Sequence, residues 1–346
     1  MSVGRAERPL IVPVFIPFQG CPHRCVFCDQ EKITSQSNQL VDPLFVKKIL
    51  DTALESSGFN SFSVREVAFY GGTFTSLPIG MIKELLNAVG PYLKKDIFHS
   101  VRISTRPDEI DTERLELIKG LGVSTVELGV QSMNDHVLNL SNRGHSVIDI
   151  VEAVKLLKRH GFKVGIQLMP GLPGDTEDRF RQSIKEVLEL QPDMVRLYPA
   201  IVISGTGLAR LYAEGKYQPL SLDAAVRMCR ESCISLENKG IPVIRLGLMS
   251  SPDLLEEGQI IAGPWHKAFG FLVRSSIHHE AIEPCLPPKG NAVRLGIRAP
   301  EREIPLIRGY KNDGIRLLEE KTGAVIDYVK PDNSVAQGMI NIQVIL

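Results

Sequence analysis

The sequence predicts an α/β fold: a partial, TIM-like (β/α)6 barrel followed by a small α+β C-terminal domain. Short apolar, β-rich runs alternate with helical patterns from Leu10 to about Val202, which is typical of repeated βα units and a parallel sheet. The chain has 346 residues, whereas a single α/β barrel commonly occupies about 200 to 250. Because the pattern changes late in the chain, we expect two domains, at 1–284 and 285–346.

The alternating patterns indicate where the barrel elements lie. Six strands are predicted, namely Leu10–Phe18, Arg65–Tyr70, Ser100–Thr105, Thr125–Val130, Lys163–Met169 and Met194–Ile201. The intervening helices are predicted at Pro43–Glu55, Gly80–Leu93, Thr112–Leu121, Val147–His160 and Thr176–Leu190. In barrels of this kind the functional residues gather at the carboxyl ends of the strands, so the motifs at those ends form the candidate site.

Further elements follow the six units. They are predicted as a helix at Leu222–Lys239, a strand at Ile241–Leu248, the start of a helix at Gly263–Gly270 and a strand at Val293–Ile297. Cys229 and Cys233 lie one turn apart on the first of these helices. With Cys285 they supply enough thiols for a second cluster, but the apolar neighbours of the first two favour simple burial.

Composition indicates a globular protein of a reducing compartment. The 40 basic and 40 acidic residues balance, so nucleic-acid binding would need a local patch of positive charge. Six cysteines, three of them in one loop, indicate thiols that remain available to metal. No run of about 18 apolar residues occurs, and no signal-peptide pattern precedes the first strand. We therefore expect a cytoplasmic protein that does not cross a membrane.

Three cysteines follow the first predicted strand, in the segment CPHRCVFC. Cys21, Cys25 and Cys28 have the spacing Cys-x-x-x-Cys-x-x-Cys, so their thiolates can converge on one small inorganic centre. Thiolates at this spacing favour an iron–sulfur cluster. A structural zinc site would need a fourth ligand, and His23 is the only candidate inside the loop. Three ligands on a four-iron cube leave one iron free for a substrate or cofactor.

This spacing, with the aromatic Phe27 just before the third cysteine, resembles the signature of the radical S-adenosylmethionine (SAM) superfamily. The resemblance implies a [4Fe-4S] cluster on Cys21, Cys25 and Cys28, with SAM chelating the free iron. An electron from the cluster then cleaves the sulfonium and produces a 5′-deoxyadenosyl radical. The resemblance also implies an external reductant, such as a flavodoxin or a ferredoxin.

The same resemblance implies cofactor contacts at the ends of the following strands. They are Phe27, the turn Gly71-Gly72-Thr73, Ser104, Gln131, Arg143 and Gln167. The turn is expected to bind the amino group of the methionine part, because paired glycines let the backbone approach a ligand. Gln131 and Arg143 are expected to hold the ribose and the carboxylate, for which a planar guanidinium is well suited.

Within the superfamily, the motifs most resemble the Elongator catalytic subunit, and next the oxygen-independent coproporphyrinogen III oxidase. Arg106-Pro-Asp108 follows the third strand as in the Elongator subunit, whereas the oxidase has a glutamate where this chain has Ser104. Asp108 belongs to this motif, but Asp108 and Glu109 can also be interpreted as caps of the next helix.

The two resemblances imply different substrates. The first implies modification of transfer RNA, and the second implies a reaction on a small molecule with the C-terminal domain as a lid. The acetyltransferase domain of the Elongator subunit has no counterpart in these 346 residues. Any attached group is therefore expected to come from elsewhere, such as from SAM itself.

The segment Ile304–Val329 has the order helix, turn, helix and strand, which resembles a KH module. Such modules clamp a nucleic-acid backbone with a Gly-x-x-Gly loop, but here Asn312 replaces the second glycine. The predicted RNA contacts are Arg308, Gly309, Lys311 and Arg316. The alternative is a small α+β cap that covers the open side of the barrel.

The sequence leaves the role of two polar residues of the barrel strands undecided. Glu127 alternates with the apolar Val126 and Leu128, so its carboxylate is expected to face the barrel interior. A buried carboxylate needs a partner or a function. Tyr198, after the sixth predicted strand, either lines the reaction cavity or packs.

Overall fold

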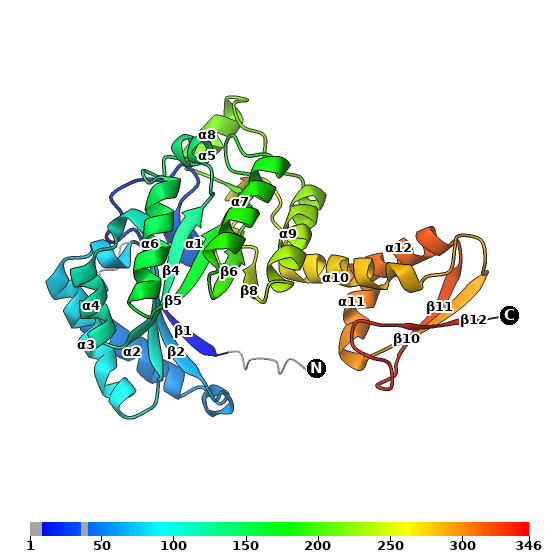
Figure 1. The fold of residues 1–346 in the computed structure, drawn as a ribbon, viewed down its shortest axis with the longest axis horizontal. Helices are drawn as coiled ribbons and strands as arrows, with labels where there is room; N and C mark the ends of the chain where they lie inside the picture. The colour runs from blue at the N-terminus through cyan, green and yellow to red at the C-terminus, as the bar shows by residue number, and fades with distance from the viewer. Residues whose placement is uncertain (1–8, 36–40, 346) are drawn as a thin grey trace.

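The structure is a computed structural model that describes residues 9–35 and 41–345. Seven parallel strands form one sheet in the order β1-β2-β3-β4-β5-β6-β8. They are β1 (Leu10–Ile16), β2 (Arg65–Gly71), β3 (Ser100–Thr105), β4 (Val123–Gln131), β5 (Lys163–Leu168), β6 (Met194–Leu197) and β8 (Val243–Leu246). The sheet curls, with helices on its outer face (Figure 1). The predicted partial barrel is therefore confirmed.

The barrel differs from the prediction in having a seventh strand. The sixth strand, predicted as Met194–Ile201, is shorter and ends before Pro199, which has no N–H to donate to a strand ladder. The strand predicted at Ile241–Leu248 is β8, and it pairs in parallel with β6. A short antiparallel ribbon of β7 (Val202–Ile203) and β9 (Ile260–Ala262) follows the end of β6.

Capping residues fix where several outer helices begin. The side chains of Asp42, Asp111, Ser146 and Thr176 accept backbone N–H groups of the first turns, which satisfies donors that lack a partner within the helix. The cap before Thr112 is thus Asp111, so the interpretation of Asp108 and Glu109 as caps is wrong. The barrel helices are α1 (Gln30–Thr34), α2 (Pro43–Leu54), α3 (Ile79–Lys94), α4 (Thr112–Gly120), α5 (Asp135–Leu140), α6 (Val147–Arg159), α7 (Glu177–Leu190), α8 (Gly207–Ala213) and α9 (Leu222–Glu237). None of the helices in the described ranges is long and apolar enough to span a bilayer.

One apolar core fills the space between the sheet and these helices. It contains the buried Cys229 and Cys233 of α9, and burial raises the pKa of the Cys233 thiol to about 12. Cys285 packs against a different core, in the C-terminal part of the chain. The three thiols are therefore divided between two cores, which fits the interpretation of the α9 pair as buried apolar residues.

A buried ion network, formed by Glu66, Arg102, Glu127 and Arg196, crosses the barrel interior. Arg102 Nη1 donates to Glu127 Oε1 at 2.7 Å, and its Nε donates to Glu66 Oε2 at 3.0 Å. Arg196 Nε lies 2.7 Å from Glu127 Oε2. Two guanidinium groups thus balance two carboxylates, and Glu127 has the partners that a buried charge requires.

Two tyrosines extend this network. Tyr70 Oη donates to Glu127 Oε1 at 3.1 Å, and Arg196 Nη1 donates to the Tyr198 hydroxyl at 3.2 Å. Burial, together with the Glu127 carboxylate, raises the pKa of Tyr70. Tyr198 thus accepts a hydrogen bond from a barrel guanidinium, and both tyrosines are partners of the ion network.

The C-terminal part of the chain forms a second sheet with its own core. The elements are α10 (Phe269–Ile282), β10 (Arg294–Ala299), α11 (Ile304–Arg308), α12 (Asp313–Thr322), β11 (Val325–Pro331) and β12 (Asn341–Ile345). The sheet order is β11-β10-β12, with β11 parallel and β12 antiparallel to β10. Figure 1 shows α10 leading from the barrel to this C-terminal module. Ile282, near the end of α10, belongs to the second core, so packing alone does not place a boundary after residue 284. The predicted domain boundary there stays a prediction.

Candidate cluster and cofactor site

The loop that carries the three cysteines connects β1 to α1 and is held by backbone hydrogen bonds to two distant segments. Val26 N–H donates to Ser141 O at 3.2 Å, and Leu208 N–H donates to Val26 O at 2.6 Å. Asn142 Nδ2 also donates to Arg24 O at 2.8 Å. These contacts fix the loop between the end of α5 and the start of α8.

Polar groups from neighbouring strand ends contact two of the cysteine sulfurs. Cys21 Sγ lies 3.4 Å from Thr73 Oγ1, and Arg143 Nη1 donates to Cys25 Sγ at 2.9 Å. Burial and the two neighbouring thiols raise the pKa of Cys28 to about 12. Three thiolates at such a site repel one another, and the positive charge of iron would offset that repulsion. The donor chemistry therefore fits a cluster.

The zinc alternative would require the cysteines and a fourth ligand such as His23 to lie close together. Among the described residues, no three His, Cys, Asp or Glu side chains lie close enough to share one metal ion. The ring of His23 lies against Gly144, where an added Cβ would be only 2.5 Å from His23 Nε2.

The glycine-rich turn after β2 packs against the base of the cysteine loop. A Cβ on Gly72 would lie 1.9 Å from Gln19 O, and the Gly72 N–H donates to Ile16 O at 2.9 Å. The turn therefore needs glycine for close contact between two backbone segments. This contact also brings the adjacent Thr73 to Cys21.

Gln131, Arg143 and Gln167 lie together at the ends of β4 and β5. Gln167 Nε2 donates to Gln131 Oε1 at 3.2 Å, and Arg143 Nη2 donates to Gly129 O at 2.5 Å. A Cβ on Gly129 would lie 3.0 Å from Gln131 Nε2 and 3.4 Å from Arg143 Nη2, so these groups converge around that glycine. Ser104 lies in register with Glu127, two residues after Arg102 of the ion network.

Phe27 has apolar neighbours. It packs against two apolar clusters, one that includes Leu172 and Ala200 and one that includes Val202 and Leu208. Its observed contacts anchor the cysteine loop.

Sequence reasoning missed the pair that positions Arg143. Arg106 is buried, and its Nε and Nη2 donate to the two oxygens of Asp108 at 3.0 and 2.8 Å. Arg106 Nη2 also donates to the backbone carbonyl of Arg143. The Arg106–Asp108 pair therefore holds the segment that directs Arg143 to Cys25. The only sequence signal was the Arg-Pro-Asp motif itself.

We expect Asp108→Asn to weaken SAM binding about tenfold, because a hydrogen bond to a charged group contributes about 1.5–3 kcal/mol and its loss frees Arg106. Equilibrium dialysis with the anaerobically reconstituted protein measures this. Asp178→Asn, which removes an exposed partner of Arg181, is the matched control. Equal affinity in both variants would contradict a positioning role for Arg106–Asp108.

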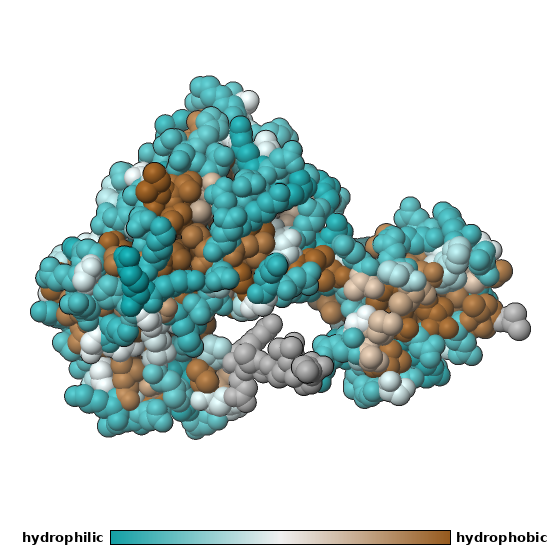
Figure 2. Space-filling view, in the orientation of Figure 1, coloured by the Kyte–Doolittle hydropathy of each residue, from teal (hydrophilic) through white to brown (hydrophobic). Residues whose placement is uncertain are grey.

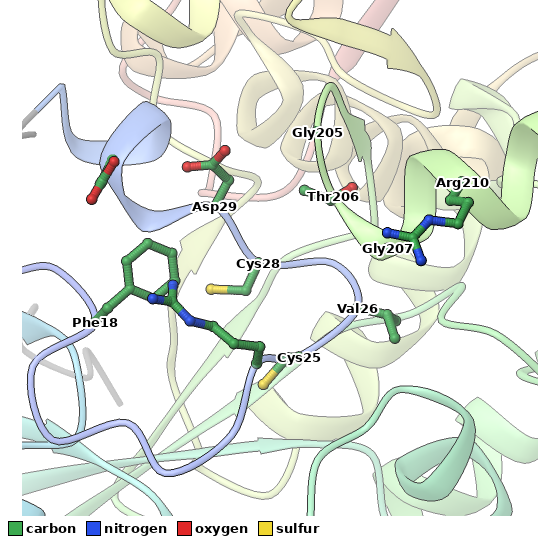
Figure 3. Close-up of a pocket in the computed structure, with 11 residues that line it drawn as sticks. Phe18, Cys25, Val26, Cys28, Asp29, Gly205, Thr206, Gly207 and Arg210 are labelled. Carbon is green, nitrogen blue, oxygen red and sulfur yellow. The ribbon is translucent and has the colours of Figure 1, made fainter.

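A cavity of about 500 Å³ opens beside the cysteine loop. Cys25 and Cys28 line it, together with the start of α8, as Figure 3 shows. The Arg24 guanidinium lies 3.8 Å from the centre of the Phe18 ring at its wall. Cys25, which lines this cavity, is also the residue whose sulfur accepts a hydrogen bond from Arg143.

The chain belongs to the radical SAM superfamily. Residues 15–187 match the Radical SAM superfamily, and residues 192–279 match the Radical_SAM C-terminal domain. Together these ranges include the cysteine loop and most of the barrel.

Two curated relatives agree with the Elongator resemblance. The tRNA uridine(34) acetyltransferase of Methanocaldococcus infernus is 30% identical over 256 residues, which cover 63% of this chain and 48% of that protein. The human Elongator complex protein 3 is 34% identical over 253 residues, which cover 61% of this chain and 46% of that protein. The chain thus matches about half the length of these relatives.

A solved structure supports the fold. The archaeal Methanocaldococcus infernus Elp3, with an N-terminal deletion, superposes with a TM-score of 0.61 and 24% sequence identity. The match covers 80% of this chain and 64% of that one. It confirms a radical SAM fold for the barrel.

Proposed function

We propose that the chain is a radical SAM enzyme whose [4Fe-4S] cluster is held by Cys21, Cys25 and Cys28. The contacts of Thr73 and Arg143 with two of these sulfurs carry the proposal. These neighbours place a hydroxyl and a positive charge beside the sulfurs, and iron binds cysteine as the thiolate. With SAM and an electron from a reductant such as a flavodoxin or ferredoxin, the cluster supplies a radical that removes hydrogen from the substrate.

The converging side chains at the ends of β4 and β5 provide groups for SAM. The amides of Gln131 and Gln167 offer donors and acceptors for the ribose and adenosyl part, and the Arg143 guanidinium offers donors for the carboxylate. We propose that Gly71, Gly72 and Thr73 contact the amino group of SAM. The contact would use polar groups of this turn other than the Gly72 N–H, which is bonded to Ile16 O. Ser104 and Phe27 are the weakest members of the proposed set, since Phe27 has apolar neighbours.

We infer that the substrate is an RNA, with transfer RNA as the first candidate. The name of the archaeal relative, tRNA uridine(34) acetyltransferase, supports this for the half of that protein that the chain matches. The acetyl transfer in that name is not proposed for this chain, which matches 48% of that protein.

The turn between α11 and α12 supports an RNA contact. The Tyr310 ring packs edge to face on His266 of the barrel, with centroids 4.7 Å apart. Arg308 and Lys311 are exposed and form no ion pair within the described residues, whereas Arg316 pairs with Asp313. We therefore propose Arg308, Gly309 and Lys311 as phosphate contacts, with Arg316 free to join them only after leaving Asp313.

The departure from the Gly-x-x-Gly pattern is compatible with this turn. Gly309, Lys311 and Asn312 have φ angles of 69°, 52° and 63°. Asparagine is among the residues that tolerate the left-handed region best. The Asn312 backbone can therefore adopt the conformation that glycine would supply.

Anaerobic incubation with SAM, dithionite and total cellular RNA, followed by nucleoside mass spectrometry, tests the proposed activity. We expect formation of 5′-deoxyadenosine and one changed nucleoside. In filter binding, the Arg308→Gln/Lys311→Gln variant should bind transfer RNA several-fold more weakly, with a salt slope reduced by about 0.7–0.9 per lost contact. Lys155→Gln on α6, which removes an exposed cation, is the control.

Two outcomes would contradict the RNA proposal. One is a wild-type chain without salt-dependent affinity for transfer RNA. The other is full activity of the Arg308→Gln/Lys311→Gln variant on a small molecule, as the coproporphyrinogen-oxidase alternative requires. In that case the C-terminal module would act as a cap.

A further inference from the structure

The three-stranded sheet of the C-terminal module has two different faces. One face contributes Leu295, Ile297 and Val329 to apolar cores, and α11 and α12 lie on one side of this sheet in Figure 1. Because side chains alternate along a strand, the next residues along β10, Gly296 and Arg298, belong to the opposite face. Their partners in the ladder are Tyr328, Lys330, Gln343 and Asn341. Figure 2 shows hydrophobic (brown) and pale surface bordered by hydrophilic (teal) surface on the module that carries this sheet.

Tyr328 crosses the middle strand of this face. A Cβ on Gly296 would lie 2.2 Å from Tyr328 Cζ, so the ring rests on a position where only glycine fits. Its hydroxyl donates to Gln343 Oε1 on β12 at 2.7 Å. The ring is therefore held across all three strands, with one side on the sheet and the other directed outward.

Two cations flank the ring. Lys330 Nζ lies 4.8 Å and Arg298 Cζ lies 5.9 Å from the ring centre. Neither forms an ion pair within the part of the chain that the structure describes. The nearby Asp327 pairs with Arg294 at 2.8 Å.

A second nearby carboxylate of the described residues also has a partner. Asp332 accepts a hydrogen bond from the Ser334 N–H at 3.0 Å, and its charge interacts with Arg298. The surroundings of the ring therefore keep an excess of positive charge, with Lys330 as its most exposed source.

We propose that this face binds an unpaired base of an RNA, with Tyr328 as the stacking platform and with Lys330 and Arg298 as contacts to the adjacent phosphates. An aromatic ring between cations is the combination that single-stranded nucleic acids bind, because every base has a π face and every nucleotide a negative charge. Lys330 covers the ring by an exchangeable cation–π contact, so a base can replace it while the ammonium moves to a phosphate. This inference rests on the proposed RNA substrate and adds a contact outside the Gly309 turn.

The test is fluorescence anisotropy with the full chain, a labelled 12-nucleotide oligouridine and a 12-base-pair RNA duplex. Tyr328→Leu should weaken oligouridine binding about fivefold or more, whereas Tyr328→Phe, which keeps the ring, should stay within about twofold. Lys330→Gln/Arg298→Gln should reduce the salt slope by about 0.7 per cation. Duplex binding should change little in the Tyr328 variants.

Several outcomes distinguish this inference from the proposed function. If the wild-type chain binds neither these two RNAs nor transfer RNA, the RNA proposal itself fails. If it binds transfer RNA but not oligouridine, only the platform is wrong. If it binds oligouridine but Tyr328→Leu and Lys330→Gln/Arg298→Gln match the Lys155→Gln control, only the platform is wrong. If Tyr328→Leu fails to fold, as judged by circular dichroism, the charge variants and Tyr328→Phe decide, and an unchanged salt slope overturns the inference.

Discussion

Replacement of Cys25 by Ala is expected to abolish the absorbance of the reconstituted cluster and all SAM cleavage. The variant keeps only two of the three cysteine ligands proposed for the cluster. Arg143 also loses the sulfur to which it donates a hydrogen bond. We expect the same result for Cys21→Ala and Cys28→Ala. The measurements are iron content, visible absorbance and 5′-deoxyadenosine formation under anaerobic conditions.

Cys285→Ala is the matched control, because Cys285 packs against the C-terminal core. It should retain iron, absorbance and SAM cleavage. A Cys25→Ala protein that kept a four-iron spectrum would overturn the ligand assignment. Zinc bound at these thiols in anaerobically purified wild-type protein would overturn the proposed function as well.

Arg102→Leu is expected to lower the free energy of unfolding by about 3–5 kcal/mol, which is typical when one partner of a buried ion pair is removed. The substitution leaves Glu66 without its guanidinium and removes one of the two cations around Glu127. Urea unfolding of the anaerobic protein, followed by circular dichroism, measures the change.

Two variants define what that result means. Arg294→Leu removes an exposed ion pair with Asp327 and should leave stability nearly unchanged. Glu66→Gln/Arg102→Leu removes one charge of each sign and should recover part of the loss. A small effect of Arg102→Leu alone would mean that water reaches Glu66 and Glu127.

The barrel was predictable because its signals are local. Periodicity placed β3 at its observed bounds, Ser100–Thr105, and placed the other strands within a few residues. The cysteine loop was predictable for the same reason, since three ligands lie within eight residues of one another. What local patterns do not encode is pairing between distant segments. The addition of β8 to β6 is one such case.

The contacts that organise the candidate site could not be predicted from the sequence for a related reason. Arg106 donates a hydrogen bond to the backbone carbonyl of Arg143, which is 37 residues away along the chain. Nothing in the sequence near either residue indicates this pairing. Phe27 has an unambiguous place in the motif, yet its observed role is apolar packing against Leu172 and Ala200. Gly72 closely approaches the chain's own Gln19, a partner that the glycine pattern does not indicate, and its contact with SAM stays a prediction.

The hydrogen bonds that join Val26 to Ser141 and Leu208 run from backbone to backbone. Neither bond uses a cysteine sulfur, so we expect both to persist when the proposed cluster is lost to oxygen. Reconstitution with iron and sulfide should then proceed without refolding of the loop.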